Sequence, residues 1–169
     1  MTQQNSTPPK RHAFTWGRIH RDAAALGARL RALAPADGGW RGVIAISVGG
    51  LVPAVLVARE LDLKVIETVC VSSYRGEVRH DVETRGNLVI HKGVAGSIDD
   101  GGHCWLLVDD LVDTGATAEA VRNMLPKAHF ATLYAKPFGR PYVDTYVEDV
   151  DQDLWVDFPW DMPPPKGGD

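Results

Sequence analysis

The sequence lacks the features that mark secreted, membrane-spanning and nucleic-acid-binding proteins. Among its 169 residues the only cysteines are Cys70 and Cys104, each within an apolar run, which favours buried reduced thiols of a cytosolic protein over a disulfide or a zinc pair. The six histidines also lack the spacing of a zinc-binding helix. No apolar run approaches the ~20 residues that a membrane-spanning helix needs, and the polar N-terminus does not resemble a signal peptide. The 22 Asp and Glu outnumber the 18 Lys and Arg, which argues against a nucleic-acid partner.

The remaining composition is that of one globular domain. With roughly 150 residues per domain as a guide, the chain is long enough for a single domain with a hydrophobic core. Residues 1–12 are polar with a Pro pair, and residues 163–169 are rich in Pro and Gly, so both are predicted to be mobile tails. Residues 13–162 show no internal repeat and no shift in composition, and we predict that they form the domain.

Helical and strand patterns alternate along this domain. Thr15 is a plausible N-cap for a helix that Pro35 ends, because apolar residues between them recur at spacings of three and four. Short continuous apolar runs predict strands that are covered on both faces. These strands are expected at residues 42–47, 64–72, 105–108 and 129–135, and further helices at residues 53–61 and 117–125. The alternation predicts an α/β fold, a mostly parallel twisted sheet flanked by helices.

One segment, residues 74–103, interrupts this alternation. It is charged and Gly-rich, and its only apolar patch is Leu88–Ile90. A long segment of this kind is either functional, such as a lid over an active site, or disordered. We favour the lid, because open α/β sheets bind ligands at the carboxyl ends of their strands, where this segment emerges.

The most informative stretch is LLVDDLVDTGAT, residues 106–117, in which a predicted strand ends in Asp109 and Asp110. A lone pair of this kind is usually a solvated acidic loop. Here Asp113 follows, and the backbone N–H groups of Thr114, Gly115, Ala116 and Thr117 at a helix N-terminus form a nest suited to a phosphate. Adjacent carboxylates suit a ribose diol and Mg²⁺, which prefers oxygen ligands. The stretch therefore predicts a site for a phosphorylated sugar.

This stretch resembles the phosphoribosyl-pyrophosphate (PRPP) motif of the type I phosphoribosyltransferases. Residues 46–61, 67–74, 126–147 and 153–162 are also similar to the purine-specific members of that family, so the resemblance extends from about Phe14 to Met162. It implies the fold of that family, with a small hood built from residues 136–162. It also implies Mg²⁺-dependent transfer of 5-phosphoribosyl from PRPP to N9 of guanine or xanthine, and less well of hypoxanthine.

The resemblance also assigns roles to individual residues. Residues 113–117 would hold the 5′-phosphate, and Asp109 and Asp110 would face the ribose hydroxyls, with Asp110 holding Mg²⁺. Asp113 would lie near purine N7 as the catalytic acid/base group. In the base pocket, Lys136 would donate to the 6-oxo group, Trp155 would stack on the ring and the Val156 backbone would meet the 2-substituent. Without the resemblance, Lys136 would be interpreted as a solvated strand end and Trp155 as a core residue.

The chain departs from the family where Val48 replaces the Arg that ordinarily contacts pyrophosphate beside an often cis peptide. Val48 and Gly49 keep the backbone of this PRPP contact but not the charge, which is worth roughly 1.5–3 kcal/mol. PRPP affinity is then expected to fall by one or two orders of magnitude, unless a cation such as Arg79 or Arg85 of the lid segment contacts the pyrophosphate instead. Ala116 also stands where Gly is usual, which carries little weight.

Two other functions stay open at this stage. Val48 favours a catalytically weak or inactive nucleotide sensor, whereas the retained Asp113 and Lys136 favour an enzyme. A remote alternative is a serine hydrolase, because Ser47 lies in an approximate nucleophile elbow with Asp109 and His129 after it. The family resemblance further implies a homo-oligomer, commonly a tetramer, in the cytoplasm, with peripheral contact to the inner membrane reported for some members.

Overall fold

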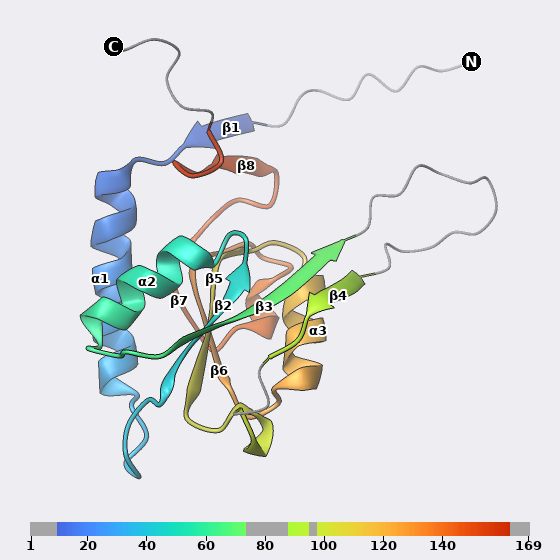
Figure 1. Cartoon of the computed structure of the whole chain (residues 1–169). Coiled ribbons are helices and arrows are strands. Elements are labelled where there is room, and N and C mark those ends of the chain that lie inside the picture. The colour runs from blue at the N-terminus through green and yellow to red at the C-terminus, as the bar shows by residue number, and fades with distance from the viewer. Residues whose placement is uncertain (1–9, 74–87, 95–97, 163–169) are drawn as a thin grey trace, which may run out of the picture.

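The alternating apolar segments assemble into a central sheet between two layers of helices (Figure 1). The computed structural model describes residues 10–73, 88–94 and 98–162. Within these ranges the sheet has the strand order β4-β3-β2-β5-β6-β7, and every neighbouring pair is parallel except β3 and β4. Its strands are β2 (Gly42–Ser47), β3 (Ile66–Ser73), β4 (Leu88–Lys92), β5 (Trp105–Val112), β6 (His129–Ala135) and β7 (Thr145–Asp149).

Helices bury the sheet from both sides, which is why its central strands are continuously apolar. Helices α1 (Trp16–Ala32) and α2 (Leu51–Glu60) cover one face, and α3 (Ala116–Met124) covers the other (Figure 1). Alternate residues of β2 belong to different cores: Val43 packs with α1 and α2, and Ile44 packs with α3. Two 3₁₀ turns, η1 (Asp100–Gly102) and η2 (Arg140–Tyr142), lie between strands.

A second, two-stranded sheet lies beyond the edge at which β2 and β5 end (Figure 1). It pairs β1 (Lys10–Ala13) with β8 (Leu154–Asp157) in parallel. Residues 10–12, which were predicted to belong to a mobile tail, are part of β1. Both strands have only four residues, and β1 is charged and exposed, so neither shows the alternation of apolar and polar residues by which a strand is predicted from sequence.

The predicted elements agree closely with the structure, and the differences are informative. The strands at 42–47 and 129–135 have the predicted bounds, and Thr15 caps α1 by accepting a hydrogen bond from the Arg18 amide at 3.2 Å. Helices α2 and α3 begin at Leu51 and Ala116, slightly before the predicted starts. Strand β5 continues four residues past the predicted end, and β4 and β7 were not predicted.

The segment predicted to be a lid lies partly outside the described residues, namely at 74–87 and 95–97. The lid therefore stays a prediction. Leu88–Lys92 is the antiparallel edge strand β4, and η1 lies at the start of β5, at the opposite end of the sheet. In the described ranges, no helix combines the length and the apolar character needed to cross a bilayer.

Candidate active site

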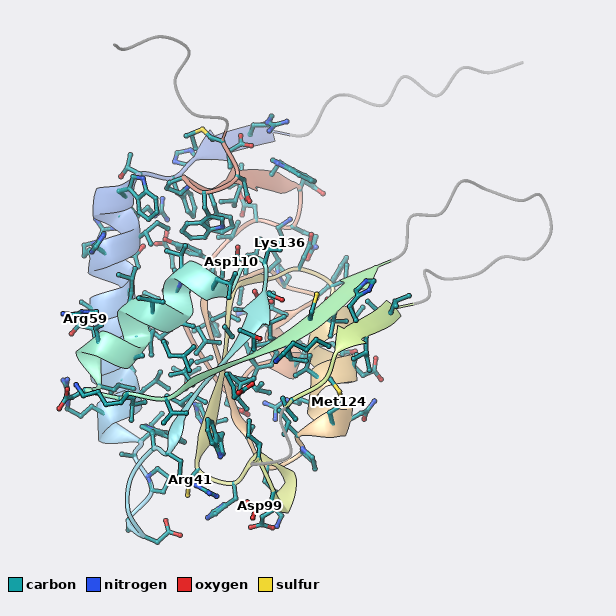
Figure 2. The ribbon with its side chains drawn as sticks, viewed as in Figure 1. Arg41, Arg59, Asp99, Asp110, Met124 and Lys136 are labelled. Atoms are coloured by element: carbon teal, nitrogen blue, oxygen red, sulfur yellow. The ribbon has the colours of Figure 1, made fainter. Side chains whose placement is uncertain are left out.

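Polar side chains collect at the carboxyl edge of the parallel strands, below β8. Asp110 on β5 and Lys136 after β6 are labelled at this edge in Figure 2. Parallel α/β sheets bind ligands at this edge, because the strand ends and the following helix N-termini converge there. The structure thus brings together most of the residues selected from the sequence.

The extension of β5 to Val112 separates the two neighbouring carboxylates. Successive side chains of a strand point to opposite faces of the sheet. Asp109 lines a cavity on the α3 face, whereas Asp110 lies against Gly49 on the other face. The two carboxylates therefore lie on different faces of the sheet at the end of β5, and the prediction that both face the ribose hydroxyls stays a prediction.

The turn after β2 fits tightly over Asp110. A Cβ added to Gly49 would lie 2.5 Å from Oδ2 of Asp110, so only glycine allows this approach. The Ser47–Val48 peptide is cis, as the resemblance implied, and the Val48 side chain is 74% exposed. The other carboxylate oxygen of Asp110 accepts a hydrogen bond from the Leu111 amide at 2.6 Å.

Burial disfavours the ionised form of both carboxylates. It raises the pKa of Asp110 to about 6, and the charge of Asp161 adds to the shift. Burial and the neighbouring Asp110 charge raise the pKa of Asp109 well above its ordinary value. A pair of buried carboxylates with raised pKa values is suited to a cationic ligand, because a cation restores the stability of the ionised form.

The turn from Asp113 to Thr117 closes the phosphate-sized space on the α3 face. A cavity of about 120 Å³ is lined by Asp109, residues 111–118 and Phe130. Gly115 has φ +87°, and a Cβ there would lie 2.1 Å from the Tyr142 ring, so glycine is required on both counts. Helix α3 begins at Ala116, and the amides of a first helical turn have no partner within the helix. Amides of this kind are suited to binding an anion.

Asp113, Lys136 and Gln152 form one hydrogen-bonded group. Lys136 is only 5% exposed, and its Nζ lies 3.1 Å from Oδ2 of Asp113. Nε2 of Gln152 donates to Oδ1 of Asp113 at 2.7 Å, while its Oε1 accepts from the Phe138 amide at 3.1 Å. Sequence reasoning missed Gln152, because a lone glutamine in an acidic turn carries no signal. Lys136, in contrast, is a fixed, nearly buried cation and not a solvated strand end.

The β1–β8 sheet carries Trp155 and Val156, the residues that the resemblance assigns to the base pocket. Trp155 is 51% exposed, and the Arg11 guanidinium lies 5.8 Å from its ring centroid. Arg11 Nε also donates to Asp157 at 3.0 Å, so it holds β1 onto β8. The Val156 side chain is buried in the core and leaves the backbone as the group that can meet a ligand. Arg11 was missed because it was assigned to a tail, and Arg85 lies outside the described residues.

The structure contradicts the serine hydrolase alternative. Ser47 is at the carboxyl end of β2, where its hydroxyl donates to the Val69 carbonyl at 3.2 Å. His129 begins β6 and lies at the other end of the parallel sheet, paired with Thr145 at 2.8 Å. A Ser–His–Asp triad requires the nucleophile and the base to be within hydrogen-bonding reach, which these positions exclude.

Comparisons with known proteins agree with this geometry. Residues 15–166 match the family model described as the phosphoribosyl transferase domain. The chain is 51% identical over 150 residues to the xanthine-guanine phosphoribosyltransferase of Desulfotalea psychrophila, covering 89% of this chain and 86% of that protein. It is 51% identical over 147 residues to the enzyme of the same name from Nitratidesulfovibrio vulgaris, covering 87% of this chain and 82% of that protein. Its fold resembles the crystal structure of a purine phosphoribosyltransferase from Pyrococcus horikoshii, with a TM-score of 0.73, 27% identity, and coverage of 95% of this chain and 99% of that one.

Proposed function

The chain belongs to the phosphoribosyltransferase family, and on this premise we propose that it is a purine salvage enzyme. It transfers the 5-phosphoribosyl group of PRPP to N9 of guanine or xanthine, and less well of hypoxanthine. The bond between ribose C1 and pyrophosphate breaks, the bond between C1 and N9 forms, and the base loses its N7 proton, which Asp113 accepts. The observation that carries this proposal is the Asp113–Lys136 pair, a fixed acceptor and a fixed donor next to an anion cavity.

The 5′-phosphate fits the cavity between β5 and α3. The amides of residues 114–117 and the hydroxyls of Thr114 and Thr117 donate to its oxygens, and Asp109 on the same cavity accepts from a ribose hydroxyl. The backbone at Val48 and Gly49 lies on the opposite side of β5, next to Asp110, where it meets the pyrophosphate. PRPP therefore lies across the end of β5, with its two phosphate ends on different faces of the sheet.

Mg²⁺ fits the donor set at Asp110. A hard divalent ion takes carboxylate oxygens, and Asp110 is a buried carboxylate whose pKa is raised to about 6 and which a nearby cation would favour in its ionised form. Gly49 lets the turn after β2 approach this carboxylate closely, because any Cβ there would collide with Asp110. When bound, Mg²⁺ offsets the negative charge that develops on the departing pyrophosphate. Asp110 is the residue that would hold it.

The base pocket selects 6-oxopurines through Lys136. An ammonium only donates, so it accepts the 6-oxo group and rejects the 6-amino group of adenine. Because Lys136 is nearly buried and paired with Asp113, its position is set before the base binds. Asp113 accepts the proton at N7 and so tunes the nucleophilicity of N9. Trp155 offers its exposed ring for stacking on the purine, and the Val156 backbone meets the 2-substituent.

The carboxylates near ribose have a second role in this proposal. The transition state carries positive charge at C1, and fixed negative groups that point to a developing cation lower its free energy. Asp109 and Asp110 lie on either face of β5 and present this charge from two sides. The family resemblance further suggests a homo-oligomer, commonly a tetramer. It also suggests a location in the cytoplasm with peripheral contact to the inner membrane.

A steady-state assay tests the proposal and separates it from the nucleotide sensor that Val48 favours. Pyrophosphate release is measured from PRPP and Mg²⁺ with guanine, xanthine, hypoxanthine or adenine. We expect turnover with the three 6-oxopurines, none with adenine, and a large loss of kcat in Asp113→Asn. Nucleotide binding without release of pyrophosphate from PRPP, whichever of the four bases is supplied, would instead establish a sensor.

A further inference from the structure

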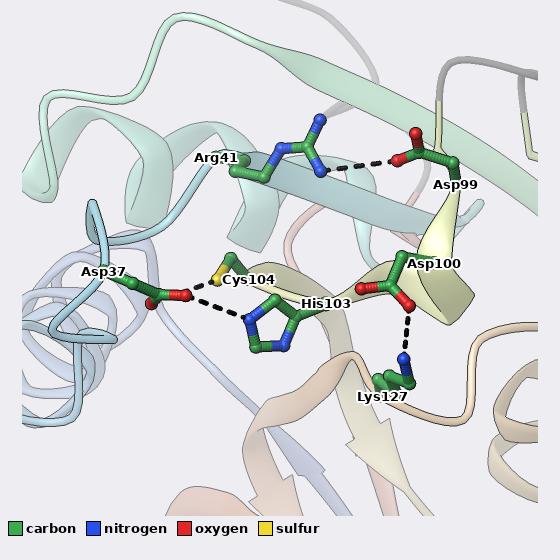
Figure 3. Close-up of polar contacts among 7 residues, drawn as sticks. All are labelled: Asp37, Arg41, Asp99, Asp100, His103, Cys104 and Lys127. Atoms are coloured by element: carbon green, nitrogen blue, oxygen red, sulfur yellow. Dashed lines mark hydrogen bonds and ion pairs between the residues drawn. The ribbon is translucent and has the colours of Figure 1, made fainter.

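A second cluster of potential ligands lies at the opposite end of the sheet from the candidate active site. Asp37 comes from the loop between α1 and β2, and His103 and Cys104 come from the turn that leads into β5 (Figure 3). Arg41 and Asp99, which flank the cluster, are labelled in Figure 2 at the end of the molecule away from Asp110. Nothing in the phosphoribosyl transfer reaction uses these residues.

The three side chains converge in a geometry that suits a small metal ion. Nε2 of His103 lies 3.3 Å from Oδ2 of Asp37, and Sγ of Cys104 lies 3.8 Å from Oδ1 of Asp37. One ligand atom from each residue can be chosen so that all three lie within 4.8 Å of one another. A tetrahedral zinc ion with bonds of about 2.0–2.3 Å separates its ligand atoms by about 3.3–3.6 Å. The His103–Asp37 and Cys104–Asp37 separations of 3.3 and 3.8 Å are close to that spacing.

The backbone holds the two loops in place. The Arg41 amide donates to the Cys104 carbonyl at 2.8 Å, and the Arg41 guanidinium lies 3.5 Å from Asp99. Cys104 has φ +62°, an uncommon conformation for a residue with a Cβ. The adjacent acidic residue, Asp100, is paired with Lys127 and is not one of the three converging groups (Figure 3).

We propose that Asp37, His103 and Cys104 form a binding site for Zn²⁺ or a similar borderline-soft divalent ion. A thiolate, an imidazole and a carboxylate are a zinc-type donor set, and a thiolate is a poor ligand for Mg²⁺ or Ca²⁺. The Asp37 and His103 side chains are 65% and 48% exposed, which leaves the fourth position open to water. The bound ion would cross-link the loops that precede β2 and β5 and so stabilise the sheet from its amino end.

Cobalt substitution tests this site without recourse to enzyme activity. The full chain is freed of metal with a chelator and titrated with Co²⁺ while the thiolate-to-cobalt charge-transfer band is recorded. We expect one Co²⁺ per chain, displacement by Zn²⁺, and a Zn²⁺-dependent rise in Tm. Asp37→Asn and His103→Ala replace exposed side chains, so they should fold, and each should weaken binding at least about tenfold.

Matched variants give the experiment its specificity. Cys104→Ser should abolish the charge-transfer band, while Cys70→Ser, which removes the other cysteine, should leave it intact. Asp110→Asn should also leave it intact, so that failure of this proposal is distinguishable from failure of the proposed enzyme function. Absence of the band, an unchanged Co²⁺ affinity in His103→Ala, or loss of the band in Cys70→Ser would each overturn the assignment and leave a hydrogen-bonded surface cluster.

Discussion

Replacing Val48 by Arg should strengthen PRPP binding, because it adds a positive charge at the position where we propose that the backbone contacts the pyrophosphate. The Val48 side chain is 74% exposed, so its replacement removes almost no packing. Stability should stay within about 0.5 kcal/mol of the parent, as for other surface substitutions. Gly49, the next residue, lies against Asp110, the residue that would hold Mg²⁺, so the new guanidinium would enter the part of the site proposed for pyrophosphate.

The size of the effect depends on how much solvent surrounds the new charge. A charge-assisted hydrogen bond is worth about 1.5–3 kcal/mol, but solvent screening at so exposed a position reduces it to about 1–1.5 kcal/mol. That corresponds to a KM for PRPP that is about five- to twelvefold lower. The gain is smaller than the one or two orders of magnitude expected from the sequence, because the sequence did not show that the position is exposed.

The assay measures initial rates over a range of PRPP concentrations at saturating guanine, at low and at high salt. The KM for PRPP should fall in Val48→Arg and the benefit should shrink at high salt, because salt screens exposed charges. The KM for guanine should not change, since Lys136 and Asp113 contact the base. Val48→Leu is the size control. An unchanged KM for PRPP at low salt, or an equal fall in Val48→Leu, would refute the reasoning.

Three further predictions concern the other parts of the site. Lys136→Met should lower kcat/KM for guanine by about 10- to 150-fold through loss of a charge-assisted hydrogen bond, and unchanged guanine kinetics would remove Lys136 from the base pocket. Gln152→Met keeps the approximate shape of the side chain but loses the N–H that positions Asp113. The kcat should therefore fall about two- to twelvefold with the KM for PRPP unchanged. A change in stability alone would indicate a purely structural role. Finally, burial raises the pKa of Asp110 to about 6, above its value in the unfolded chain. The native state therefore binds more protons than the unfolded state between these two pKa values. As a result, the metal-free protein should lose stability as pH rises from about 5 to 7. Thermal unfolding across that range should show a flatter dependence in Asp110→Asn, and an identical slope in both proteins would contradict the assignment.

The parts of the fold that could be predicted are those in which local sequence and final structure agree. Strand β2 is apolar at nearly every position because helices cover both of its faces, and Gly and Pro mark the turn that follows. The turn formed by residues 113–117 was also predictable. These residues are contiguous, and the start of the helix that follows them can be recognised from local sequence alone.

Residues that join the site through distant pairing were not predictable. Arg11 reaches Trp155 only because β1 pairs with β8 from the other end of the chain, and Gln152 reaches Asp113 from a turn 39 residues away in the sequence. Asp37 and Cys104 likewise meet across two loops, so neither the count of cysteines nor a histidine spacing could indicate their proximity. In each instance the strand order decides which side chains meet.

The division of Asp109 and Asp110 shows how a strand boundary determines the chemistry of a site. The apolar run of β5 ends at Val108, which predicted two adjacent carboxylates at the end of the strand, suited to one ribose diol. Pairing with β6 continues to Val112, opposite Ala135, and so fixes both residues in extended backbone. Extended backbone sends neighbouring side chains to opposite faces, so one carboxylate joins the phosphate cavity and the other joins the Gly49 turn. An acidic protein can therefore bind a strongly anionic substrate, because its carboxylates are spread across two faces and its phosphate contacts come from backbone amides.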